Sequence, residues 1–408
     1  MKAGNLAEAD GSLRDAVDST AAERRRAPLP PLTAMAAEQW RLLAERAIEP
    51  NGYYLPDWEL AVNASARGRP GVFALTVWRD AGIGQDTAPH LIGLLPVISA
   101  WDAYRLPVKA LVSADPYGTL GTPPIDRDMA AEAIAGLMQR ARVAGVRALV
   151  LRNMSLDGPA MKAFAEVLRT QSLAPRVLQS HVRACLDATR DADELLRHAL
   201  GAKKLKELRR LRNRLAEHGN VTFKVARTPA DVATELEVFL ELEASGWKAK
   251  RGTALRQHEG DAAFIRRATA ALALHGQCEI VSLHAGETAV AAAIVIRHRS
   301  HAYYYKIGVD ERFAKYSPGV QLTLELTQAM CADRAIAFVD STAGAGNAMI
   351  EPIWQQRLTI GDLFIPLQRH DPLAMLVFAG LVLRLRIREP LQQLVRSLRN
   401  YKRKQTRA

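Results

Sequence analysis

A change in hydrophobic period marks the C-terminal half of the chain. Residues 302–309, AYYYKIGV, are aromatic or β-branched and predict a strand. From Val320 to Cys331 apolar residues recur about every 3.6 positions, which predicts a helix, and residues 336–339 predict a second strand. Ser317 stands at the expected N-cap, with Pro318 at the first helical position. The pattern predicts a strand, a tight loop, a helix and a strand.

A similar order of elements is predicted twice along the chain. Upstream, the pattern predicts, in order, strands at 71–80, 90–100 and 110–113, a helix at 128–144, a strand at 148–154, a helix at 159–170 and a strand at 176–187. Downstream, it predicts a strand at 221–226, helices at 231–245 and 261–274, and a hairpin at 278–298 before the stretch above. No residue-level repeat accompanies this order, so only the order suggests two related halves.

The helix start near Ser317 is a candidate anion site. Its first backbone N–H groups are unpaired and carry a partial positive charge, which suits a phosphate. Gly319 would let an anion approach the backbone closely. Most Ser-Pro-Gly helix starts only cap a helix, so the spacing alone leaves both interpretations open.

Two stretches carry a family resemblance. YYYKIGVDERFAKYSPGVQL, together with LEASGWKAKRGTAL at residues 242–255, resembles the CelD-type and BioF2-like acetyltransferases, a branch of the GNAT superfamily related to the Fem-type transferases. The resemblance covers residues 177–366. It implies an α/β (α+β) fold of tandem GNAT-like domains, each a mixed, mostly antiparallel sheet flanked by helices, with the N-terminal domain degenerate.

The resemblance also implies a cofactor loop. In GNAT proteins the loop between the fourth strand and the next helix holds the pyrophosphate of acetyl-CoA. The matching residues here are Tyr316, Ser317, Pro318, Gly319 and Val320. This chain departs from the commoner loop at one position, because Gln321 stands where a second small residue is usual.

The element order and the resemblance together divide the chain into five segments. They are a disordered arm (1–32), a degenerate N-terminal GNAT-like domain (33–190), a basic connecting helix (191–220), a C-terminal acetyltransferase domain (221–370) and an amphipathic basic tail (371–408).

Acyl transfer from a thioester to an amine needs a base, donors for an oxyanion and a proton for the thiolate. The resemblance implies an oxyanion donor in the backbone of strand 303–309. Glu243 and Asp340 are the candidate bases, and Tyr305 and Tyr316 are candidate proton donors. Each has a plainer interpretation, since a carboxylate often caps a helix or pairs with a cation and a strand tyrosine is usually core.

Four further residues are expected to bind substrate. They are Trp247, Lys306, Asp310 and Trp354. Lys306 would suit a phosphate or carboxylate of the acceptor, although a salt bridge between Lys306 and Asp310 is the plainer interpretation. The histidines show no metal-ligand pattern, so we expect no metal.

The net charge of +12 is concentrated in two segments. Residues 203–214 carry +6, either as the solvated face of a docked helix or as a face that contacts an anion. Residues 384–408 carry +8 and follow an apolar run at 373–383. That C-terminal region predicts either binding to an anionic membrane surface through 373–408 or a docked helix with a frayed tail.

Composition suggests a compartment. The mean hydropathy is −0.09, and no run reaches the roughly 20 apolar residues of a spanning helix. The three cysteines have no paired spacing, and the first residues lack the apolar region of a signal peptide. We expect a cytoplasmic protein, peripheral at the inner face of the membrane.

The resemblance then supplies the expected function. It is an N-acyltransferase that uses acetyl-CoA as co-substrate and acts on an amine of a sugar, a polysaccharide precursor or a small molecule, in cellulose or exopolysaccharide biosynthesis. Two alternatives stay open. One is a Fem-type peptidyl transferase that uses aminoacyl-tRNA, which would explain residues 203–214; otherwise no nucleic acid is expected. The other is a non-catalytic accessory protein of a membrane polysaccharide-synthesis complex.

Overall fold

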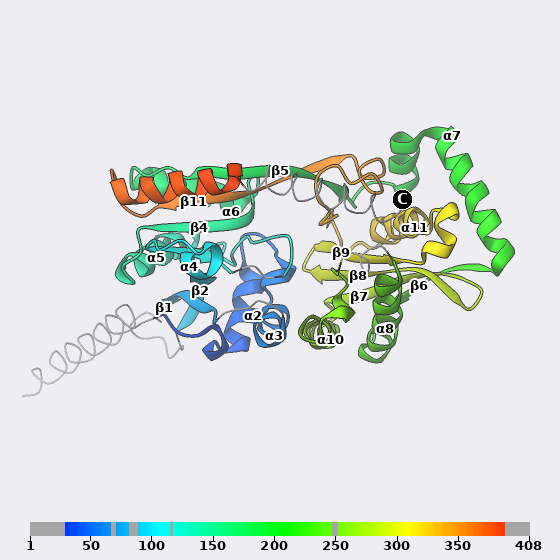
Figure 1. Ribbon diagram of the computed structural model, residues 1–408, viewed down its shortest axis with the longest axis horizontal. Helices are drawn as coiled ribbons and strands as arrows, with labels where there is room; N and C mark the ends of the chain where they lie inside the picture. The colour runs from blue at the N-terminus through cyan, green and yellow to red at the C-terminus, as the bar shows by residue number, and fades with distance from the viewer. Residues whose placement is uncertain (1–28, 67–70, 81–88, 115–116, 247–251, 388–408) are drawn as a thin grey trace, which may run out of the picture.

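The computed structural model describes residues 29–66, 71–80, 89–114, 117–246 and 252–387. Within them, one sheet of eleven strands runs through the molecule in the order β1-β2-β3-β4-β11-β5-β10-β9-β8-β7-β6 (Figure 1). The strands are β1 (Phe73–Arg79), β2 (His90–Ser99), β3 (Ala110–Ser113), β4 (Ala148–Ser155), β5 (Arg176–Asp187), β6 (Val221–Ala226), β7 (Cys278–Ala285), β8 (Thr288–His298), β9 (His301–Val309), β10 (Phe338–Asp340) and β11 (Gln356–Pro366).

Most neighbouring strands in this sheet are antiparallel. Only β3 with β4 and β9 with β10 are parallel among the described pairs. In the chain, each parallel pair comes after an antiparallel hairpin. The hairpin is β1–β2 in the first half and β7–β8 in the second. The predicted fold class is therefore confirmed, with a mixed, mostly antiparallel sheet in two similarly ordered halves.

The two halves exchange a strand. β11 comes from the end of the chain but pairs with β4, and β5 comes from the first half but pairs with β10. β5 and β11 also pair with each other along most of their length. The predicted segment 221–370 therefore contributes a strand to the sheet of segment 33–190.

Helices cover both faces of the sheet. The helices are α2 (Ala37–Arg46), α3 (Pro56–Ser65), α4 (Ala100–Tyr104), α5 (Ala130–Val143), α6 (Pro159–Thr170), α7 (Ala192–Leu215), α8 (Pro229–Ser245), α10 (Glu259–Leu274), α11 (Pro318–Ala332) and a helix at 372–387. The 3-10 turns are η1 (Leu32–Ala34), η2 (Gly52–Tyr54), η3 (Ala216–His218), η4 (Leu255–Gln257) and η5 (Glu311–Tyr316). In the first half, α5 and α6 pack on one face and α2, α4 and the C-terminal helix on the other. In the second half, α8 and α10 face α7 and α11 across the sheet, and α3 joins α10.

The predicted elements agree closely with the observed ones, with three differences. β11 and α4 were not expected. The last residues of the predicted arm are part of the fold, because the Leu32 N–H donates to Val72 O at 2.8 Å and Leu32 is fully buried. The remainder of the arm, residues 1–28, lies outside the described residues.

The basic connecting helix α7 packs against α11 through its leucine side chains. Leu208 and Leu215 are buried, and the cationic side chains lie mainly toward solvent, except that Arg212 pairs with Glu325 of α11 at 2.7 Å. Gly201 breaks the helix with φ 70° and ψ 164°. A cavity of about 350 Å³ lies between α7 and α11.

Candidate active site

The parallel strands β9 and β10 separate at one point. They pair only from His301 with Phe338 to Tyr303 with Asp340, where β10 ends and β9 continues. The hydroxyl of Thr342 donates to Tyr304 O at 2.6 Å just beyond this point. The second half of β9 therefore continues without β10 as a partner, and α11 begins near its far end.

A β-bulge lies in β9 at the same place. Val295 of β8 pairs with Tyr304 and Ile294 pairs with Lys306, so Tyr305 is the additional residue. A bulge turns two successive side chains toward one face, and here Tyr305 and Lys306 both face the α8 side. The Lys306 ammonium lies 5.7 Å from the Tyr305 ring centre.

Glu243 meets Lys306 on this face. Helix α8 approaches β9 so closely at Gly308 that a Cβ there would lie 2.8 Å from the Glu243 nitrogen. The fully buried Glu243 carboxylate lies 3.6 Å from Lys306 Nζ and accepts from Leu255 N–H at 2.9 Å. The Glu243 carboxylate thus links the start of η4 to β9, and its cationic partner, Lys306, is partly exposed.

The alternative interpretation, a salt bridge between Lys306 and Asp310, is wrong, because Lys306 pairs with Glu243 and Asp310 pairs with Arg312. The Arg312 guanidinium lies 2.7 Å from the Asp310 carboxylate. Hydrogen bonding to this guanidinium lowers the pKa of Asp310. A cavity of about 630 Å³ lies beside Asp310 and the C-terminal end of α8.

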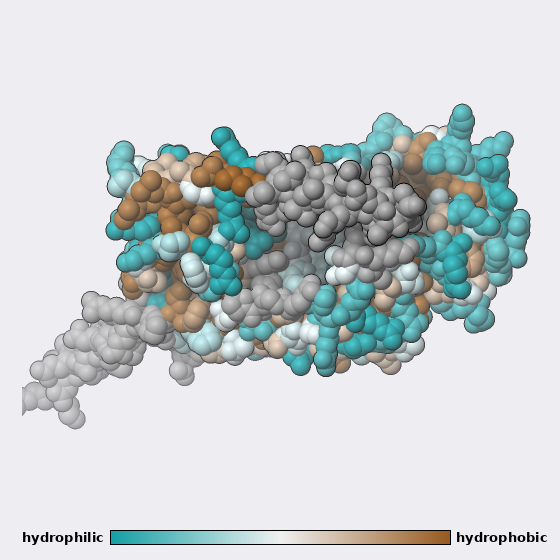
Figure 2. All heavy atoms as spheres, viewed as in Figure 1, coloured by the Kyte–Doolittle hydropathy of each residue, from teal (hydrophilic) through white to brown (hydrophobic). Residues whose placement is uncertain are grey.

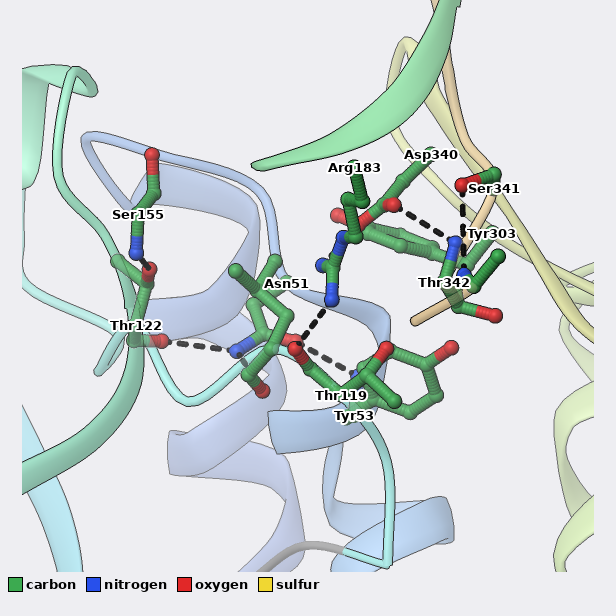
Figure 3. Close-up of polar contacts among 12 residues, drawn as sticks. Asn51, Tyr53, Thr119, Thr122, Ser155, Arg183, Tyr303, Asp340, Ser341 and Thr342 are labelled. Carbon is green, nitrogen blue, oxygen red and sulfur yellow. Dashed lines mark hydrogen bonds and ion pairs between the residues drawn. The ribbon is translucent and has the colours of Figure 1, made fainter. Parts of the chain in front are cut away.

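Asp340 lies in a different, deeply buried cluster (Figure 3). Arg183 of β5 donates to Asp340 from one terminal nitrogen and to Thr119 O, at 2.7 Å, from the other. The Thr342 N–H donates to the second Asp340 oxygen at 2.8 Å. Because Arg183 and Thr119 come from the first half of the chain and Asp340 from the second, this ion pair joins the halves.

Aromatic side chains surround the cluster. The Tyr53 ring lies 5.4 Å from that of Tyr303 and 5.9 Å from that of Tyr305. Burial raises the pKa of Tyr53, and the negative charge of Asp340 raises it further. Tyr305 donates its hydroxyl proton to Tyr117 O at 2.9 Å, and Tyr303 donates to Pro50 O at 2.8 Å.

Sequence reasoning missed Arg183, Tyr53 and Asn51. Asn51 accepts from Tyr53 N–H and donates to the carbonyls of Leu120 and Thr122, which fixes η2 against the opposite loop. The one available signal was the single arginine in the otherwise apolar end of strand 182–186. An arginine that must be buried requires an anionic partner.

The predicted cofactor loop adopts an unexpected conformation. Ser317 is the N-cap residue of α11, as predicted, but it has left-handed φ and ψ angles of 54° and 51°, and its side chain makes no capping hydrogen bond. Pro318 takes the predicted first helical position. The Tyr316 hydroxyl and His218 Nε2 lie 2.9 Å apart.

The helix start is also packed more closely than expected. Gly319 is buried, and a Cβ there would lie 3.0 Å from Met349 Sδ and 3.3 Å from Val309 Cγ2. Gln321, the residue that departs from the commoner loop, donates to Leu208 O of α7 at 2.8 Å. That position serves to hold α7 against α11.

The two predicted substrate tryptophans differ. Trp354 is buried and donates its indole N–H to Thr327 Oγ1 at 2.9 Å, so it packs against α11. Trp247 lies outside the described residues. Glu243, Tyr305 and Lys306 thus lie together, Asp340 lies beyond them at the strand separation, and the loop 316–320 lies at the far end of β9.

Neither a metal site nor a membrane-spanning helix is present in the described part of the chain. No group of three or more histidines, cysteines, aspartates or glutamates there could hold a metal ion. Among the same residues, no helix is long and apolar enough to span a membrane.

The fold is found in solved structures. FemX has a TM-score of 0.52 at 10% identity, with 84% of this chain and 98% of that chain covered. The C-terminal domain of a proposed lysylphosphatidylglycerol synthetase from Agrobacterium fabrum has a TM-score of 0.50 at 13% identity, with 85% and 95% covered. A conserved protein of unknown function from Bacteroides thetaiotaomicron also has a TM-score of 0.50 at 13% identity, with 84% and 100% covered.

Sequence comparison finds a family match for part of the chain only. No curated protein matches the chain significantly. Residues 202–348 match the family model described as an acetyltransferase (GNAT) domain. The matched stretch contains α8, the bulged β9, the loop before α11 and Asp340. Residues 202–348 are therefore similar in sequence to a GNAT-type acetyltransferase domain.

Proposed function

We propose that this protein is an N-acyltransferase that transfers an acetyl group from acetyl-CoA to an amine. The observation that supports it most is the separation of β9 from β10 beyond Tyr303 and Asp340, beside a bulge at Tyr305. A thioester lying beside the second half of β9 would meet the backbone of that strand. The similarity of residues 202–348 to a GNAT domain makes acyl transfer the expected chemistry here.

The pyrophosphate of the donor would lie at Tyr316, Ser317, Pro318, Gly319 and Val320. This loop stands at the start of α11, a helix of 15 residues whose N-terminal partial charge is positive. Its place at the end of β9 would let the pantetheine arm run along the strand toward Tyr305.

The transfer step requires one proton to leave the amine. The neutral amine nitrogen would bond to the thioester carbon, the C–S bond would break, the amine proton would pass to a carboxylate, and the thiolate would take a proton to give CoA. Glu243 is our first candidate for the base, because its Lys306 partner is partly exposed and can yield to an acceptor. Asp340 is the second, because Arg183 is buried and holds it more firmly.

The acceptor is proposed as an amine of a sugar, a polysaccharide precursor or a small molecule. Lys306, Asp310, Trp247 and Trp354 stay our candidates for contacting it. The link to cellulose or exopolysaccharide synthesis rests on the family resemblance. A cytoplasmic location fits this function because the donor is a cytoplasmic metabolite.

An activity assay tests this function. Release of CoA thiol from acetyl-CoA is measured with amino sugars, nucleotide-linked amino sugars and polyamines as acceptors. We expect Glu243→Gln to lower kcat/KM by about 10²-fold to 10⁴-fold, and Glu241→Gln, an exposed residue of the same helix, to leave it unchanged. Equal rates for both variants would remove Glu243 as the base.

One alternative has its own observation. The exposed cationic face of α7 and the FemX-like fold suit a transferase that takes its acyl group from aminoacyl-tRNA. Activity that disappears after ribonuclease treatment, without any use of acetyl-CoA, would establish it. No CoA binding and no transfer from either donor would favour the non-catalytic accessory protein.

A further inference from the structure

The C-terminal helix at 372–387 has two apolar faces, and the fold uses only one. Ala374, Val377 and Leu381 are buried against the first half of the sheet, and Phe378 stacks 5.4 Å from Phe364. The opposite side exposes a second set of apolar residues. These are Leu373 (51% exposed), Leu376 (68%), Leu383 (59%) and Ile387 (47%).

These four residues recur with the helical period, so they form one line along the helix, which we name the apolar ridge. Figure 2 shows hydrophobic side chains along this helix at the molecular surface. An isolated exposed leucine needs no explanation, but a continuous line of them on one helix marks an interaction surface.

Helix α4 adds an exposed tryptophan near the end of the ridge. Arg384 donates to Tyr104 O, and its guanidinium lies 5.4 Å from the Tyr104 ring, which holds the two helices together. Both helices pack in the same hydrophobic cluster on one face of the sheet. Trp101 of α4 is 52% exposed, with the Arg105 guanidinium 5.9 Å from its ring.

Most of the exposed charges near the ridge and Trp101 are positive. Arg105 and Lys109 follow α4 and Arg386 lies on the C-terminal helix, and Asp102 of α4 is the exposed acidic residue beside Trp101. The sequence from residue 384 to residue 408 has a net charge of +8. An apolar helix face bordered by arginines, with a tryptophan at its edge, has the composition of a helix that lies in a membrane interface.

We propose that the apolar ridge and Trp101 dock the protein on an anionic lipid surface, with the helix at 372–387 lying in the plane of the interface. Basic residues next to a membrane gain about 1 kcal/mol each from anionic lipid, so charge and burial act together here. The proposal is independent of the acyl transfer.

Vesicle co-sedimentation of the full-length protein tests this surface. We expect binding to phosphatidylcholine vesicles that contain phosphatidylglycerol, weaker binding at high salt, and little binding to phosphatidylcholine alone. The double variant Leu376→Asp/Leu383→Asp should bind at least about tenfold more weakly, and Trp101→Ala should also weaken binding. Leu274→Asp is the matched control, since Leu274 is 71% exposed on α10, away from the ridge.

Two results would overturn the proposal. One is equal vesicle binding by the wild type and by a double variant whose thermal unfolding is unchanged. The other is a wild-type dimer that the double variant converts to a monomer, with no vesicle binding by either. Acetyl-CoA titrations of the same variants keep this question separate from the proposed activity, because loss of lipid binding should leave donor binding unchanged.

Discussion

At the scale of single residues, the buried pair of Arg183 and Asp340 stands out. Their side chains are 1% and 0% exposed, and they come from opposite halves of the chain. Two charges removed from water are costly unless each is paired and hydrogen-bonded, and here Thr119 O and Thr342 N–H complete the bonding.

Removing one member of this pair should be costly. Arg183→Met leaves the Asp340 carboxylate buried without its cation, and we expect it to lower the free energy of unfolding by about 3–5 kcal/mol. The double variant Arg183→Met/Asp340→Leu removes both charges and should recover part of that loss. Urea unfolding of the three proteins measures the effect, and a double variant no more stable than the single one would contradict it.

Two histidines, the buried His298 and the half-buried His301, predict a dependence on pH. Burial lowers the pKa of His298 to about 4, and burial followed by the charge of Arg299 lowers that of His301 to about 4. An unfolded histidine has a pKa near 6.5, so between about pH 6.5 and pH 4 the unfolded chain binds protons that the folded chain does not. The free energy of unfolding therefore falls as the pH drops through this range. The 3.8 Å approach of Glu45 to the neutral His298 ring is therefore not an ion pair.

The corresponding measurement compares unfolding at pH 7 and pH 5. The free energy of unfolding should fall by about 2 kcal/mol for each ring between these values. The variant His298→Gln/His301→Gln should lose most of that slope. A slope as steep as that of the wild type would assign the pH dependence to other groups.

At the scale of elements, the strands and helices could largely be predicted from the sequence. The strand of β5 and the helix α6 agree with their predicted ranges residue for residue, because each has a clear period and begins or ends near a turn signal. β11 was missed because Gly361 and Asp362 interrupt its apolar pattern, at the place where its pairing with β4 and β5 is irregular.

The kink of α7 carries a prediction at this scale. Gly201 has φ and ψ angles that other residues adopt only with strain, and no atom lies within 4 Å of a Cβ built there. The cost of Gly201→Ala should thus come from the backbone alone, about 1–3 kcal/mol of stability. Ala202→Gly, on the next exposed residue, should cost about 1 kcal/mol or less, and thermal unfolding compares them.

At the scale of the whole molecule, the contacts between the two halves of the chain could not be predicted from the sequence. The family resemblance pointed to Glu243, Tyr305 and the loop before α11, all in the second half. Arg183, Asn51 and Tyr53 come from the first half. The pairing of β5 with β10 brings Arg183 to Asp340, and η2 packs against β8 and Tyr303. A single sequence contains no direct signal for such a contact.

The packing at Gly319 also changes how the donor site must be tested. A large side chain there would meet Met349 as well as the pyrophosphate, so a simple Gly319→Glu variant could lose binding through packing. Replacing Met349 with alanine removes the nearest of the side chains that a residue larger than glycine at position 319 would meet. In that background, Gly319→Ala and Gly319→Glu differ mainly in charge.

The most direct measurement is calorimetric titration of acetyl-CoA into the wild type and these two double variants. The proposed donor site predicts a Kd on the order of micromolar for the wild type, similar binding by Gly319→Ala/Met349→Ala, and loss of binding by Gly319→Glu/Met349→Ala through charge repulsion. Absence of wild-type binding, or equal binding by both double variants, would contradict the acetyl-CoA site at the start of α11.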